Sequence, residues 1–98
     1  MKKQIVLDGA QMKDSKGAFQ YLARAFKFPA GYKGSLEEVE DLLMSLEQPV
    51  DVIWIRHEAM LDTLEELGDE IFETIFTCAQ ENDKIGLYVA RSLFEEEE

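Results

Sequence analysis

The residues of this chain best suited to chemistry are carboxylates on one side of a predicted helix. Ser35 and Glu38 form the pattern S-x-x-E, in which a serine oxygen and a glutamate carboxylate each satisfy a free backbone N–H of the first helical turn. Apolar residues then recur at helical spacing, at Leu36, Val39, Leu42, Leu43 and Leu46. At roughly 100° per residue, the opposite side of the helix holds Glu37, Glu40, Asp41 and Met44. That side is predicted to present a carboxylate cluster, with a methionine beside it, to solvent.

A glycine-rich loop leads into this helix and carries Tyr32. Pro29, Gly31 and Gly34 lie close together in it and interrupt regular structure. The acidic side of the helix has a simple interpretation as an ordinary solvated surface. The same side can instead cover a basic group on a partner. Carboxylates at positions i, i+3 and i+4 can also hold a divalent cation weakly, but the sequence has no EF-hand pattern, so no metal site is predicted.

Two other residues carry reactive groups, and neither has a convincing catalytic setting. His57 is the only histidine, next to Glu58, and acid–base work would need a partner and a pocket. Cys78 is the only cysteine and becomes nucleophilic only beside a cation or a base. We expect an exposed His57 and a partly buried Cys78 that packs as a small hydrophobe. The sequence has no phosphate loop, CxxC pair or serine elbow, so no catalytic residue and no cofactor is predicted.

The composition is that of one acidic globular domain. The chain has 98 residues, of which 46% are hydrophobic, and its net charge is −11. This charge repels nucleic acid and anionic membranes, so the expected partner is a basic protein. It also argues against close self-association through the acidic side, and we expect a monomer when the chain is free. The sequence contains neither a signal-peptide core nor a membrane-spanning run, so a cytoplasmic location is expected.

The elements that position these residues alternate between strands and pairs of helices. A short strand, residues 5–7, precedes a helix that begins at Asp14 or Ser15 and runs to about Lys27, with Phe19, Leu22, Ala23 and Phe26 buried. The second strand, residues 50–55, is rich in β-branched residues and is predicted to be covered on both faces. The next helix is predicted to end at Gly68, as a C-cap, and another to begin at Asp69.

That last helix is predicted to bury Ile71, Phe72, Ile75, Phe76 and Ala79 and to end at Asn82. Residues 85–90 then alternate as a third strand. The fold class is therefore α/β, with a small three-stranded parallel sheet and four helices in the order β-α-α-β-α-α-β. Residues 1–92 are predicted to form a single domain, and residues 93–98 a disordered acidic tail.

This element order resembles that of the barstar family, intracellular inhibitors of a secreted bacterial ribonuclease. The resemblance covers roughly residues 4–90 and includes Pro29-x-x-Tyr32, which leads into Leu36-Glu37-x-x-x-Asp41-x-Leu43. Pro49 before the second strand, Trp54 within it and Gly68 before the last helix also fit the family. The resemblance implies a module whose helix and preceding loop plug a nuclease active site, where carboxylates replace substrate phosphates. Such carboxylates bind Arg, Lys and His through charge-assisted hydrogen bonds.

The resemblance also implies a role for individual residues. Asp41 aligns with the dominant anchoring aspartate of the family, and Glu37 takes the place of a second aspartate one turn earlier. Tyr32 matches the second of two adjacent tyrosines, which is more a structural position than a contact. Gly31 takes the place of the contacting tyrosine.

Several family contact positions have changed. Glu40 stands in place of a tryptophan, Met44 and Ser45 in place of a threonine and a glycine, and Cys78 in place of a glutamate. The sequence thus predicts a barstar-like inhibitor of a ribonuclease whose partner-binding residues are Tyr32, Glu37, Glu40, Asp41, Met44 and Ser45. The alternative is a regulatory or immunity protein of the same fold that binds a different basic, non-nuclease partner.

Overall fold

The computed structural model describes residues 3–29 and 31–90. The elements follow the predicted order β-α-α-β-α-α-β, and they are β1 (Lys3–Asp8), α1 (Ser15–Phe26), α2 (Leu36–Met44), β2 (Val50–Ile55), α3 (His57–Leu64), α4 (Glu66–Glu81) and β3 (Ile85–Val89). A 3₁₀ helix, Gly9–Gln11, follows β1. The predicted acidic tail, residues 93–98, lies outside the described residues. No helix in the described part of the chain is long and apolar enough to cross a membrane.

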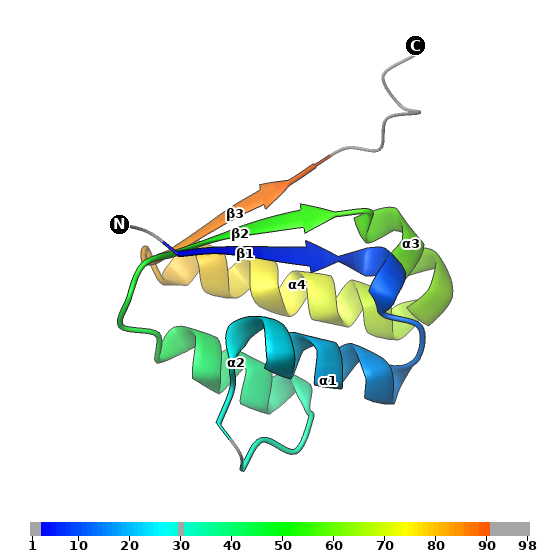
Figure 1. Ribbon diagram of the computed structural model, residues 1–98, viewed down its shortest axis with the longest axis horizontal. Helices are drawn as coiled ribbons and strands as arrows, with labels where there is room; N and C mark the ends of the chain where they lie inside the picture. Colours follow the sequence, from blue (N-terminus) through cyan, green and yellow to red (C-terminus); the bar gives the residue numbers. More distant parts are fainter. Residues whose placement is uncertain (1–2, 30, 91–98) are drawn as a thin grey trace.

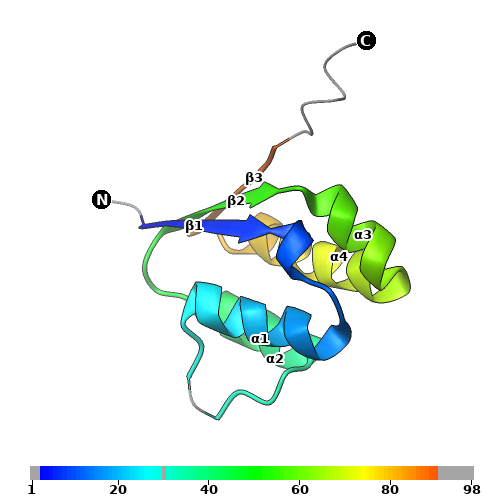
Figure 2. The same ribbon diagram turned by 45° about the vertical axis from the view of Figure 1, so that its right-hand side comes forward.

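The three strands form one parallel sheet in the order β1-β2-β3, which confirms the predicted fold class. Helices α1, α2 and α4 lie on one side of this sheet, and α3 lies beyond the end of β2 (Figure 1). The same layering is visible after a 45° turn (Figure 2). Because each pair of strands is joined through two helices, the chain has the length it needs to return and run parallel.

The core fills the space between the sheet and the helices. Alternate strand residues, such as Leu7, Val52 and Trp54, point into it and are fully buried. The helices contribute Ala18, Leu22, Phe26, Val39, Leu43, Met60, Ile71, Ile75 and Cys78. Burying a large apolar side chain contributes about 1.5–3 kcal/mol, so this cluster is the main stabilising feature of the fold.

The prediction that β2 is covered on both faces is wrong. Its residues alternate between buried and half-buried, and Ile53 lies on the half-buried face. The neighbours of Ile53 in register, Val6 and Tyr88, are 52% and 57% exposed. The reason is that α1, α2 and α4 lie on the same side of the sheet, so no helix in the described part of the chain covers the opposite face (Figure 1). The β-branched residues on this face pack against side chains of the neighbouring strands and are not buried beneath a helix.

The predicted boundary between the last two helices is also wrong. The break falls at Glu65, whose φ of 56° is left-handed, and Gly68 lies inside α4 rather than at a C-cap. A Cβ atom on Gly68 would lie 2.9 Å from the carbonyl oxygen of Met60 and 3.2 Å from the Cα of Leu61. Gly68 is therefore needed for the close approach of α3 and α4. Phe76, predicted to be buried, is 44% exposed because it lies on the outer side of α4.

We predict that Gly68→Ala destabilises the protein, by about 1–3 kcal/mol, because the added methyl group meets backbone atoms that cannot move independently. An alanine in an ordinary helix interior would instead stabilise by about 0.5–1 kcal/mol. Urea unfolding followed by circular dichroism measures the difference. Gly31→Ala is the matched control, since nothing lies within 4 Å of a Cβ at that position. Stabilisation by Gly68→Ala would contradict the packing role.

Candidate partner-binding surface

The first turn of α2 is fixed by the predicted pair Ser35 and Glu38, but the glutamate has unexpected partners. Ser35 is the N-cap, and its hydroxyl oxygen accepts a hydrogen bond from the backbone N–H of Glu38 at 3.2 Å. The Glu38 carboxylate reaches beyond the helix and accepts hydrogen bonds from the N–H groups of Lys33 at 3.0 Å and Gly34 at 2.8 Å. The capping pair thus stabilises the loop as well as the helix start.

Gly34 makes this arrangement of the loop possible. Its φ of +97° lies in a region that glycine adopts easily and other residues rarely do. The two successive N–H groups then point at one carboxylate, which forms charge-assisted hydrogen bonds with both. Glu38 is half-buried at this position. A single acidic side chain therefore fixes how the loop enters α2.

Tyr32 supports the loop from its inner side. Its ring lies 5.0 Å from that of Phe28, which in turn stacks 5.5 Å from Phe26. The hydroxyl oxygen is buried and has no hydrogen-bond partner among the described residues. Burial, and secondly the charge of Glu38, raise the pKa of Tyr32 to about 12. Tyr32 is therefore a half-buried residue that supports the loop, whereas the acidic side chains on the outer side of α2 are exposed to solvent.

The outer side of α2 carries the other predicted site residues. All of them are exposed, and they are Glu37, Glu40, Asp41, Met44 and Ser45. The Ser45 hydroxyl donates a hydrogen bond to the carbonyl oxygen of Asp41 at 2.8 Å, at the C-cap of the helix. Within the part of the chain that the structure describes, no ion pair involves the three carboxylates. They are available to a partner's cations.

The described residues contain no group of three or more His, Cys, Asp and Glu side chains arranged to hold a metal ion. The cation interpretation of Glu37, Glu40 and Asp41 therefore has no geometric support in the described residues. Two interpretations of this side of α2 stand, an ordinary solvated surface and a contact surface for a basic partner.

Helix α4 holds α2 from behind, through contacts that the sequence did not reveal. The Asn82 side-chain amide donates a hydrogen bond to the carbonyl oxygen of Leu43 at 3.0 Å. The Cys78 thiol points at the carbonyl oxygen of Glu40, with 3.9 Å between sulfur and oxygen. The sequence marked Asn82 only as the end of a helix, because its partner lies 39 residues away. These contacts hold the C-terminal half of α2 against α4.

The reactive residues outside α2 do not form a catalytic pair. Cys78 is only 1% exposed, and burial, followed by the charges of Glu40 and Glu81, raises the pKa of its thiol to about 11. The thiol is therefore protonated at neutral pH and is not an activated nucleophile. The expected exposure of His57 is wrong, because its side chain is 22% exposed and its ring stacks on Phe72 at 5.6 Å. It is half-buried because α3 begins directly after β2, beside α4.

The elements define a small α/β domain with a three-stranded parallel sheet. A family model described as Barstar (barnase inhibitor) matches residues 2–91. The match covers nearly the whole chain, and the protein belongs to the barstar family. No curated protein matches the chain.

We predict that Glu38→Ala loosens the loop and costs about 0.5–1.5 kcal/mol of stability, because the N–H groups of Lys33 and Gly34 lose their carboxylate acceptor to water. Amide hydrogen exchange should become faster at Lys33 and Gly34 and should change little in β2. Glu38→Gln keeps one acceptor oxygen and should therefore lose less stability than Glu38→Ala. Glu37→Ala, one residue earlier and exposed, is the control and should stay within about 0.5 kcal/mol of the wild type. Equal exchange rates in Glu38→Ala and the wild type would refute the role of Glu38.

Proposed function

We propose that this protein inhibits a ribonuclease by covering its cationic active site with the outer side of α2 and the loop before it. The contact residues would be Glu37, Glu40, Asp41, Met44 and Ser45, with Tyr32 supporting the loop. The observation that carries the proposal is that the three carboxylates are exposed, without ion pairs in the described residues, on a helix fixed at both ends. Membership of a family of barnase inhibitors supports a ribonuclease as the partner.

The physical basis is replacement of substrate phosphates by carboxylates. Ribonuclease sites bind the phosphate groups of RNA through cationic side chains, and a carboxylate offers the same cations two acceptor oxygens. Asp41 and Glu37 lie one turn apart, so they can meet two neighbouring phosphate subsites. Glu38 and Asn82 hold α2 and its loop before binding, which lowers the entropy lost on association.

Long-range attraction supports the same partner class. Residues 35–83 contain fifteen carboxylates and one cation, Arg56. A field of this sign accelerates encounter with a basic protein, and physiological salt screens it beyond about 8 Å. Association with a basic nuclease should therefore slow as salt is added. We also propose a cytoplasmic location, because the family that the chain resembles is intracellular, and a monomer when free, because the acidic side disfavours close self-association.

A second candidate is a regulatory or immunity protein that binds a different basic partner through the same surface. Two features favour it. In the family that the chain resembles, a tryptophan stands at the position of Glu40, which is exposed here. A threonine stands at the position of Met44, which is 39% exposed. These changes alter the chemistry of the surface while Asp41 is retained. Binding of a basic non-nuclease protein that depends on Asp41, together with no inhibition of any ribonuclease, would favour this candidate.

We predict that Asp41→Ala weakens inhibition of small basic ribonucleases, barnase included, by roughly 10- to 100-fold, the loss expected for a hydrogen bond to a charged group. Stability should change by less than about 0.5 kcal/mol because the side chain is exposed. Inhibition constants measured at low and physiological salt test both points.

Asp62→Ala is the matched control for that measurement, because Asp62 is an exposed aspartate on α3, away from the proposed surface. Asp62→Ala removes one negative charge, as Asp41→Ala does, and should change inhibition only slightly. An equal loss in the two variants would mean that Asp41 acts through net charge alone. Full inhibition by Asp41→Ala would remove it from the interface.

A further inference from the structure

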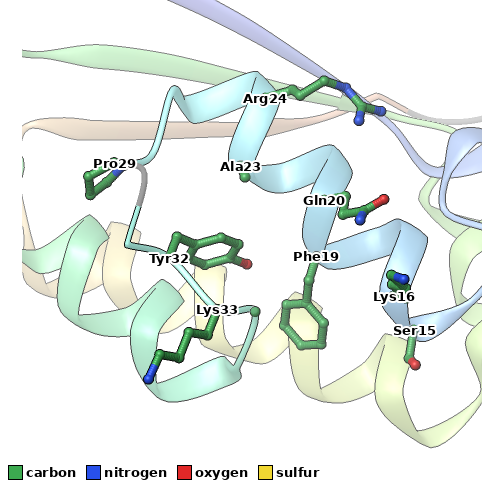
Figure 3. Close-up of a pocket in the computed structure, with 10 residues that line it drawn as sticks. Ser15, Lys16, Phe19, Gln20, Ala23, Arg24, Pro29, Tyr32 and Lys33 are labelled. Atoms are coloured by element: carbon green, nitrogen blue, oxygen red, sulfur yellow. The ribbon is translucent and has the colours of Figure 1, made fainter.

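One cavity lies between α1 and the loop before α2, and no residue of α2 lines it. Its volume is about 740 Å³, and the residues that line it include Lys16, Phe19, Gln20, Arg24, Tyr32 and Lys33 (Figure 3). Such a volume is within the range of sites that bind small molecules. The loop before α2 forms one wall of this cavity, and the contact residues proposed on α2 itself do not line it.

The charge around the cavity is opposite to that of the rest of the molecule. Three cations line it, Lys16, Arg24 and Lys33, and no carboxylate does so among the described residues. Residues 13–34 carry five of the ten lysines and arginines of the chain but only one of its 21 acidic residues. In a protein of net charge −11, this segregation makes the cavity a local attractor for anions.

The walls of the cavity are aromatic. Tyr32 extends from the loop towards α1, and Phe19 projects from α1 beside the loop (Figure 3). Gln20 lies on α1 between Lys16 and Arg24, while Arg24 and Lys33 extend outward at opposite sides of the cavity. The cavity thus has aromatic walls and a cationic rim. A ligand with one flat ring and one anionic group fits it, because the ring would contact the walls and the anion would contact the cations.

The Tyr32 hydroxyl adds an independent observation. It is buried, lacks a hydrogen-bond partner among the described residues, and points towards α1. An unsatisfied buried hydroxyl is unfavourable, so a hydrogen-bond acceptor beside Tyr32 would be stabilising. Because the pKa of Tyr32 is raised to about 12 by burial, the hydroxyl keeps its proton to donate at neutral pH.

We propose that this cavity binds an aromatic phosphate monoester, and specifically a nucleoside monophosphate. The base would stack on Phe19 and Tyr32, and the phosphate would bind Lys16 and Arg24, with Lys33 at the opposite rim. Stacking on aromatic side chains tolerates every base, so little base selectivity is expected. The phosphate is bound by charge-assisted hydrogen bonds to lysine and arginine. This site shares Tyr32 and Lys33 of the loop with the proposed nuclease contact, whereas the exposed residues of α2 do not line it.

Titration of the ¹⁵N-labelled full chain with uridine 5′-monophosphate tests the proposal, with amide chemical shifts as the readout. Saturable shifts should concentrate in residues 15–24 and 31–34. Uridine and inorganic phosphate are the comparison ligands, and each should bind more weakly than the complete nucleotide. The Lys16→Ala, Arg24→Ala double variant should weaken binding by about 5- to 30-fold, as two exposed cations allow. Phe19→Leu keeps apolar volume and should weaken binding by removing the stacking surface.

Lys84→Ala is the control, since Lys84 is exposed in the turn before β3 and does not line the cavity. It should bind the nucleotide as the wild type does, and so should Asp41→Ala, which separates this test from the ribonuclease proposal. Absence of saturable shifts would overturn the proposal. So would equal shifts with inorganic phosphate alone, or binding that Lys84→Ala weakens as much as the double variant.

Discussion

The carboxylate of Glu38 is the interaction on which the partner-binding surface depends. It accepts hydrogen bonds from the N–H groups of Lys33 and Gly34, while its own N–H is capped by Ser35. These contacts join the loop to the first turn of α2, so neither can move without the other. The loop otherwise has little regular structure, because its proline and glycines prevent it. A single half-buried glutamate therefore fixes the position of a short glycine-rich loop.

The rest of the domain supports that junction from behind. Asn82 and Cys78 on the α4 side contact backbone carbonyl groups of α2, and Val39 and Leu43 seat the helix in the core. The inner side of α2 thus provides stability, and the outer side is free to remain acidic. Carboxylates crowded on one helix repel one another, and ion pairs among the described residues do not relieve this. Such unrelieved local conflict is typical of functional surfaces.

The sequence predicted the fold well because its strongest signals are local and periodic. The apolar stripe of α2, the S-x-x-E cap and the β-branched run of β2 each identify an element from neighbouring residues alone. The prediction of the outer side of α2 had the same basis, and its residues are indeed exposed. That they bind a partner is a proposal, which rests on charge, availability and family membership.

What the sequence could not predict involves contacts between distant segments. Gly68 resembled a helix terminator, but the approach of Met60 and Leu61 from α3 determines its role. His57 is half-buried because Phe72, fifteen residues later, packs against it. Asn82 depends on a carbonyl group of α2. The open face of the sheet was missed for the same reason, since β-branched composition does not reveal on which side the helices pack.

The most direct test of the central claim is a map of the protein surface covered in a complex with barnase or another small basic ribonuclease. Amide hydrogen exchange of the full chain, free and bound, provides that map. We predict that binding slows exchange in residues 31–45 and leaves α3 and β3 unchanged. Protection centred on α3 or on the open face of the sheet would contradict the account, even if the ribonuclease were inhibited.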